Sequence, residues 1–122
     1  MKVEHSEDKA SRLTGEQARL PVVLMGRFRP WTYRISHAEL EIRRTDGGDA
    51  VDRVMFYGVL AVKLKSTYSP LILRRADERR RQEMLDFLGI EDPRGRIIPV
   101  LVSSGPDDGF VACASFVLRQ HL

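Results

Sequence analysis

The sequence has a single cysteine, few lysines and no long apolar run, and these shortages exclude several classes of protein. One cysteine excludes an internal disulfide, so a disulfide-stapled secreted scaffold is not expected. The longest apolar runs are four or five residues, far below the roughly 20 that a transmembrane helix needs. The first eight residues, MKVEHSED, contain no apolar stretch behind a basic start, so no secretory signal is predicted. We therefore expect a cytoplasmic protein with no membrane partner.

Lysine is scarce because 16 of the 20 basic residues are arginine, which stays charged in any environment and offers a planar fork to carboxylates and phosphates. The net charge is only +3, too small an excess to predict nucleic-acid binding by itself. Residues 1–19 hold four basic and four acidic groups, residues 20–65 hold eight and five, and residues 66–122 hold eight and eight. The whole excess of positive charge thus lies in the middle segment.

The length and composition favour one folded domain. The chain has 122 residues, close to the commonest domain size, and its 43% hydrophobic and 30% charged residues are typical of a globular protein. Residues 1–19 mix charges with Ser, Thr and Gly and contain only scattered apolar side chains, so we predict a flexible lead-in there. Residues 20–122 are predicted to form a single α+β domain.

Alternating apolar and polar residues predict strands along most of this domain. Leu40 and Ile42 share one face of a segment whose other face carries Glu39, Glu41 and Arg43. The predicted strands are residues 20–28, 31–44, 51–65, 71–73, 96–103 and 110–118. Their short connections favour a mainly antiparallel sheet of about six strands, rolled or barrel-like.

One helix is predicted between the fourth and fifth strands. Asp77 suits the N-cap position, and Gly89 suits the left-handed conformation that ends a helix at Leu88. Met84, Phe87 and Leu88 are expected on its apolar face. The arginines in and before this helix have acidic residues within helical reach, which predicts a largely self-neutralised surface.

Three features set the predicted strands apart from simple half-buried strands. Tyr33 and Ile35 are out of phase with the residues that follow them, which predicts a bulge or bend near residues 36–37. Gly58 occupies the apolar side of its strand, which suggests a bulge or the close approach of another element. The strand at residues 110–118 is apolar on both faces, so we expect it to be central and covered on both sides.

The most suggestive surface lies in the segment GRFRPWTYR, residues 26–34. The candidate binding residues are Arg27, Arg29, Trp31, Tyr33 and Arg34. If the chain stays extended through Pro30, the first four project to one side and place two cations beside two large rings. Such a face can anchor a protein contact, or it can stack a base and pair its phosphate. Alternatively, Trp31 and Tyr33 pack in the core and the arginines are solvated.

No set of residues predicts catalysis, a metal or a cofactor. Cys113 lies in an apolar run without a nearby histidine, which indicates a buried structural thiol. His5, His37 and His121 are isolated and show no metal-ligand spacing. The serines and aspartates of residues 103–109 have the composition of a turn. We predict no catalytic residues, no metal and no cofactor.

The sequence therefore favours a small non-enzymatic binding domain that contacts a protein partner or forms a homo-oligomer. The alternative is a nucleotide or single-stranded nucleic-acid binder that uses the same arginine and aromatic residues. A further alternative is an enzyme whose groups are too dispersed along the chain to be assembled from the sequence.

Overall fold

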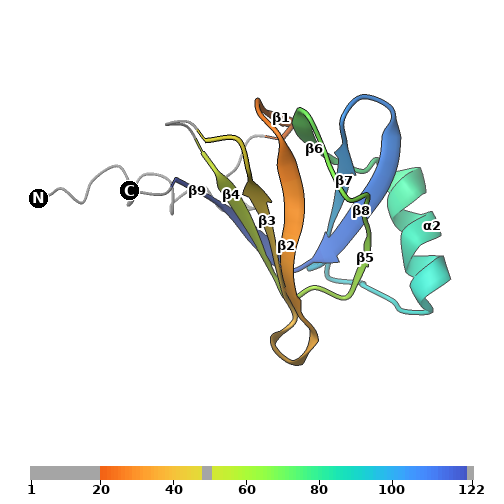
Figure 1. The fold of residues 1–122 in the computed structure, drawn as a ribbon. Helices are drawn as coiled ribbons and strands as arrows, with labels where there is room; N and C mark the ends of the chain where they lie inside the picture. Colours follow the sequence, from red (N-terminus) through yellow and green to blue (C-terminus); the bar gives the residue numbers. More distant parts are fainter. Residues whose placement is uncertain (1–19, 48–50, 121–122) are drawn as a thin grey trace, which may run out of the picture.

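The computed structural model describes residues 20–47 and 51–120, which form two antiparallel sheets and one α-helix (Figure 1). The first sheet consists of β1 (Val22–Leu24), β5 (Ala61–Lys63), β6 (Leu71–Arg75), β7 (Ile98–Ser103) and β8 (Asp107–Cys113). The second consists of β2 (Phe28–Arg34), β3 (Glu39–Arg44), β4 (Arg53–Tyr57) and β9 (Ser115–Arg119). A 3₁₀ turn, η1 (Ile35–His37), joins β2 to β3, and α2 (Glu78–Leu88) joins β6 to β7.

The two sheets differ in what covers them. The first has the strand order β1-β6-β7-β8-β5, and α2 lies on its outer side, so we call it the helix-covered sheet (Figure 1). The second has the order β2-β3-β4-β9, and no helix of residues 20–47 and 51–120 lies on its outer side. We call it the open sheet.

The core is one apolar layer between the sheets. Its main contributors from the open sheet are Leu40, Ile42, Val54, Phe56, Phe116 and Leu118, and those from the helix-covered sheet are Leu71, Leu73, Val100, Val102, Val111 and Cys113. The rings of Phe56 and Phe116, which face each other across β4 and β9, lie 5.9 Å apart. Burying a side chain of this size stabilises the fold by about 1.5–3 kcal/mol. The inward positions predicted for Leu40 and Ile42 are confirmed.

The bounds predicted for the helix are also confirmed. The Asp77 carboxylate accepts a hydrogen bond from the backbone N–H of Arg80 at 2.8 Å, which satisfies one of the free donors of the first turn. Gly89 ends the helix in the left-handed conformation, with φ of +69°. Met84 and Leu85 are buried, but Phe87, predicted on the apolar face, is 82% exposed.

The chain crosses between the sheets three times, first from β1 to β2 and then at two points that lie side by side. One crossing runs from β4 to β5 through Gly58, and the other runs from β8 to β9 through Ala114. The backbone N–H of Ala114 donates to the Tyr57 carbonyl at 2.9 Å. Gly58 has φ of +64°, and a Cβ atom there would lie 2.7 Å from the Cβ of Ala114. Of the two interpretations of Gly58, the close approach of another element is confirmed.

The predicted fold was wrong in strand number, helix position and closure. Residues 31–44, 51–65 and 110–118 each contain two strands rather than one. The described residues thus form nine strands, and the helix lies between the sixth and the seventh. Over the described residues, the strands form two sheets and no closed barrel. For residues 51–65 and 110–118 the error arises because an apolar pattern continues through a corner without marking the change of sheet. For residues 31–44 it arises because the predicted bulge or bend near residues 36–37 is a full turn, η1, that joins β2 to β3 within the open sheet. The α+β composition and the antiparallel pairing agree with the prediction.

The corner at Ala114 explains the two apolar faces predicted for residues 110–118. In β8 one face lies in the core, with Val111, and the other lies on the side of α2, with Phe110. In β9 the inward residues face the core of the open sheet. β8 lies between β7 and β5, as a central strand does, whereas β9 is an edge strand.

Two further predictions concern the whole chain. The predicted lead-in, residues 1–19, lies outside the described residues, and the single domain over residues 20–122 stays a prediction. Within the described part of the chain, no helix combines the length and the apolar composition needed to cross a membrane.

Candidate functional site

The candidate binding residues lie on or next to β2, an edge strand of the open sheet. Trp31 is 51% exposed and Tyr33 is 41% exposed, so neither ring is part of the buried core. Pro30 pairs with Ile42 and Thr32 pairs with Glu41, which leaves Trp31 without a partner in β3. Trp31 is therefore the extra residue of a β-bulge, a feature that redirects a side chain and bends the strand.

The bulge breaks the one-sided arrangement that an extended strand would have produced. Arg29 lies opposite Arg43 of β3, and Tyr33 lies opposite Leu40. Arg43 and Leu40 point to opposite faces of β3 because they are three residues apart. Arg29 and Tyr33 therefore lie on opposite faces of the open sheet, and the predicted common face of two cations and two rings is wrong.

Trp31 instead meets an arginine from the neighbouring strand. The guanidinium carbon of Arg43 lies 4.6 Å from the centre of the Trp31 ring, within the range of a cation–π contact. Arg43 Nε in turn donates to Glu41 Oε2 at 2.9 Å. Arg29 pairs with Arg43 in the β2–β3 register and so lies on the same face. We call Arg29, Trp31, Glu41 and Arg43 the Trp31 cluster.

Glu41 and Arg43 were not among the predicted site residues. Their alternation with Leu40 and Ile42 already indicated that they face outward, and the structure confirms this. Their position beside Trp31 depends on the β2–β3 register and on the bulge, which the alternation alone does not define.

The other two predicted site residues occupy different surroundings. Arg34 lies opposite Glu39, and its Nη1 is 4.0 Å from Glu39 Oε1. Arg27 precedes β2, and its backbone closes the neighbouring loop. The Arg27 N–H donates to Asp46 Oδ2 at 3.1 Å, and the Arg27 carbonyl accepts from the Thr45 N–H at 2.8 Å. Arg27 thus has a structural role at the end of the open sheet.

Carboxylates accompany most of the arginines on the open sheet. Besides the pairs already described, Arg53 Nε lies 3.8 Å from Asp52 Oδ1 and Arg44 Nε lies 3.5 Å from Asp46 Oδ1. A shallow hollow of about 200 Å³ on the outer face is bordered by both Arg34 and Glu39. The surface around Trp31 is therefore of mixed charge rather than a continuous basic groove.

The edge of β2 is poorly suited to accept another strand. Pro30 has no N–H to donate, and the bulge at Trp31 interrupts the regular spacing of backbone groups. Both features are common protections of edge strands against pairing with another chain. A partner at this edge must therefore be recognised mainly by side chains.

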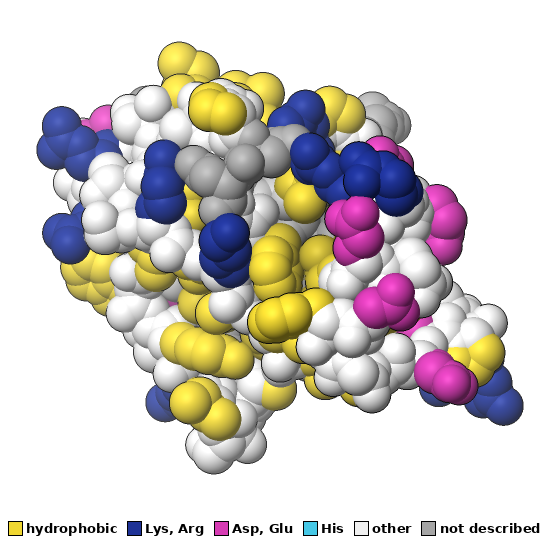
Figure 2. All heavy atoms as spheres, turned by 90° about the vertical axis from the view of Figure 1, so that its right-hand side faces the viewer, with side chains coloured by type: hydrophobic (Ala, Val, Ile, Leu, Met, Phe, Trp, Pro, Cys, Tyr) yellow, Lys and Arg dark blue, Asp and Glu magenta, His cyan; other side chains and the backbone are white. Residues whose placement is uncertain are grey.

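The helix-covered sheet carries a second hollow, of about 360 Å³, between α2 and the strands β7, β8 and β5. Leu101 and Phe110 line its floor, Met84 and Phe87 line it from α2, and Lys63 lines it from β5. Figure 2 shows this side of the molecule, where hydrophobic side chains lie across the centre and charged side chains of both signs gather toward the upper right.

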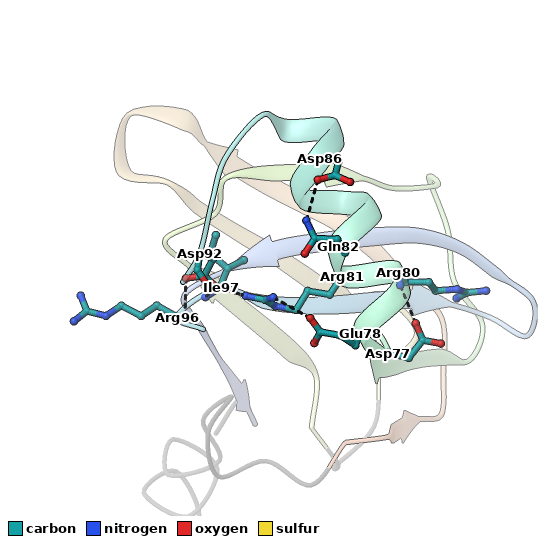
Figure 3. A network of polar contacts seen from close by, with 9 residues as sticks. All are labelled: Asp77, Glu78, Arg80, Arg81, Gln82, Asp86, Asp92, Arg96 and Ile97. Atoms are coloured by element: carbon teal, nitrogen blue, oxygen red, sulfur yellow. Dashed lines mark hydrogen bonds and ion pairs between the residues drawn. The ribbon is translucent and has the colours of Figure 1, made fainter. Parts of the chain in front are cut away.

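Two of the three arginines of α2, Arg79 and Arg81, are paired with carboxylates, as the sequence predicted. Arg79 Nη1 lies 2.9 Å from Glu83 Oε2, and Arg81 Nη1 lies 3.4 Å from Glu78 Oε2. Arg81 also reaches beyond the helix to Asp92, with 2.5 Å between Nη2 and Oδ2 (Figure 3). These contacts compensate Arg79 and Arg81 and tie α2 to the loop that follows it.

Asp92 organises the loop between α2 and β7. Its carboxylate accepts hydrogen bonds from the backbone N–H groups of Ile97 at 2.8 Å and Arg96 at 2.9 Å (Figure 3). The Ile97 bond is the main cause of a lowered pKa at Asp92, to which the Arg96 bond and the Arg81 guanidinium add, while burial opposes them. The lowered pKa has a structural explanation and does not by itself indicate catalysis.

The described cysteine and histidine lie in separate surroundings. No group of three or more His, Cys, Asp or Glu side chains in this part of the chain could hold a metal. Cys113 is buried, as predicted, and its thiol lies 3.7 Å from the Ile98 carbonyl. His37 Nδ1 lies 3.1 Å from Ser36 Oγ in the exposed η1 turn. The chain matches no protein-family model, no curated protein and no solved structure.

Proposed function

We propose that this protein is a non-enzymatic interaction domain that contacts another protein, or a second copy of itself, through the Trp31 cluster. The observation that carries the proposal is a half-exposed tryptophan at a bulge in a protected edge strand, with an arginine stacked on its ring. Tryptophan and arginine are the residues that most often dominate the binding energy of protein interfaces. The contact works in the cytoplasm, a location supported by the single, buried cysteine.

The charge arrangement favours a protein over a nucleic acid. A single-strand binder combines a continuous basic groove with aromatic faces that are free to stack on bases. Here Arg43 occupies one face of Trp31, and Glu41 lies within hydrogen-bond distance of Arg43. Mixed charges of this kind suit a partner surface that also carries both signs.

The proposal is tested with the full chain and a Trp31→Ala/Arg29→Ala variant. Both are compared by sedimentation velocity over a range of concentrations. In parallel, a photo-crosslinking residue is placed at Thr32 in producing cells. We expect either self-association of the wild type or one protein crosslinked at Thr32. The double variant should weaken the contact by about 30-fold or more, the loss expected when a central tryptophan with a cost of about 2 kcal/mol is removed.

Phe87→Ala is the matched control, because it removes another exposed ring, which lies on α2 and not on the open sheet. This variant should retain the contact. The proposal is wrong if the wild type is monomeric and gives no Trp31-dependent crosslink. It is also wrong if oligonucleotides quench the fluorescence of Trp31, the only tryptophan, with a steep dependence on salt, because that result indicates a nucleic-acid binder.

A further inference from the structure

The hollow on the helix-covered sheet combines an apolar interior with an unburied aromatic ring. Leu101 and Phe110 lie opposite one another in β7 and β8 and form the floor. Met84 and Phe87, three residues apart, both line it from α2. Phe87 is nevertheless 82% exposed, so its ring gains little from contact with the protein alone. A ligand that covers this ring would remove apolar surface from water.

Gly109 brings two strands close together at the hollow. Gly109 of β8 also lines the hollow, and a Cβ atom at this position would collide with the carbonyl oxygen of Lys63. Only glycine therefore allows β8 and β5 to approach here. The hollow of about 360 Å³ is at the small end of the range for ligand sites, which is roughly 300–1,000 Å³. Its size suits a small molecule rather than a helix of a partner protein.

The charges at the hollow favour a negative group on the ligand. Lys63 from β5 and Arg80 from α2 both line it, whereas Glu83, the one carboxylate among its described lining residues, is bound by Arg79 at 2.9 Å. A neighbouring hollow of about 300 Å³ shares Arg80 and Leu101 and is bordered by three further arginines and one aspartate. With the Arg79–Glu83 pair counted in full, the described residues that line the two hollows include five basic and two acidic side chains.

We propose that this hollow is a binding site for a small carboxylic acid with an apolar body. The body lies on Leu101 and Phe110 and is covered by Phe87, and the carboxylate is directed to the ammonium group of Lys63. Charged hydrogen bonds of this kind contribute more than neutral ones, and the apolar walls supply the remaining affinity. The site does not depend on the Trp31 cluster, which belongs to the other sheet.

Decanoate, kept below its micelle concentration, is the probe, and decanol is the matched neutral probe. Binding is measured by isothermal titration calorimetry and located by NMR shifts of the Leu101 methyl and Phe110 ring signals. We expect saturable binding of one decanoate per chain, with shifts at these two residues. Lys63→Gln should weaken decanoate binding about tenfold and leave decanol binding unchanged, because a charged hydrogen bond is lost.

Phe87→Ala should weaken both probes, and its exposed position keeps the fold intact, which circular dichroism checks. Trp31→Ala is the control that should bind decanoate normally. The proposal is overturned if decanoate does not saturate, if the shifts lie away from the hollow, or if neither variant weakens binding. Equal binding of decanol and decanoate by the wild type also overturns it, because the carboxylate then contributes nothing to binding. None of these results depends on a contact at the Trp31 cluster.

Discussion

Gly58 combines a left-handed backbone with a close neighbour. A side chain there is disfavoured by the φ of +64°, and its Cβ would lie 2.7 Å from the Cβ of Ala114 in the adjacent crossing. We expect Gly58→Ala to lower the free energy of unfolding by more than the roughly 1–2 kcal/mol that the left-handed conformation costs alone. Urea unfolding followed by far-UV circular dichroism measures this loss.

Gly95 provides a matched control for this prediction. Its φ is +65°, but nothing lies within 4 Å of the position that a Cβ would occupy. Gly95→Ala should therefore show the conformational cost alone. Adding Ala114→Gly to Gly58→Ala should recover the part of the loss that comes from the contact. Equal losses for the two glycine substitutions, with no recovery in the double variant, would contradict the explanation.

The lowered pKa of Asp92 predicts that the free energy of unfolding depends on pH. Because hydrogen bonds from Ile97 and Arg96 and the charge of Arg81 lower its pKa in the folded state, its contribution is complete above the ordinary aspartate pKa of 3.8. This contribution is lost as the pH falls through the lower pKa of the folded protein. Asp92→Asn should therefore be less stable than the wild type at pH 7, and the difference should shrink below about pH 4.

Thermal unfolding between pH 7 and pH 2 checks this prediction. Asp86→Asn is the control, because Asp86 is an exposed carboxylate whose hydrogen bond comes from the neutral amide of Gln82. A difference between Asp92→Asn and the wild type that is the same at every pH would show that the charge of Asp92 does not contribute.

Among the elements of the fold, α2 owes part of its stability to the side chains of its first turn. Asp77 accepts the hydrogen bond of the Arg80 N–H, and the acidic Glu78 suits the positive end of the helix. Asp77→Ala should lower the free energy of unfolding by about 1 kcal/mol, the typical cost of losing an N-cap. Urea titration measures the change, with Glu91→Ala, an exposed carboxylate beyond the helix, as the control. A loss of the same size in both variants would rule out the capping explanation.

The same helix and its neighbouring strands show which elements could be predicted from the sequence. Asp77 and Gly89 mark the ends of α2 through local backbone chemistry, so its bounds were correct. The crossing at Ala114 has no such local signal, because apolar residues continue on both sides of it. The corner lies against Gly58, which is 56 positions earlier in the printed sequence. Contacts between distant segments are not contained in a local pattern.

At the scale of the whole molecule, two surfaces with different chemistry lie on different sheets. The Trp31 cluster belongs to the open sheet, and the apolar hollow belongs to the helix-covered sheet. Trp31 and Arg29 of the proposed site could be named from the sequence because their types and spacing are visible there. Glu41 and Arg43 could not, because the β2–β3 register brings them to Trp31. The hollow could not be predicted either, since the sequence pattern places Phe87 on the apolar face of α2, whereas its side chain is exposed.

The features that protect the edge of β2, Pro30 and the bulge at Trp31, limit how many chains could join through this edge. An unprotected edge lets each added chain offer a new edge to the next, so growth has no natural end. Pro30 and the bulge at Trp31 interrupt such growth at this edge, because they remove the repeating backbone pattern that it needs. A complex formed through the Trp31 cluster is complete once the side chains are covered, as in a symmetric pair of chains. Under the proposed function, the molecule would therefore present a large aromatic ring to its partner and form complexes of fixed stoichiometry.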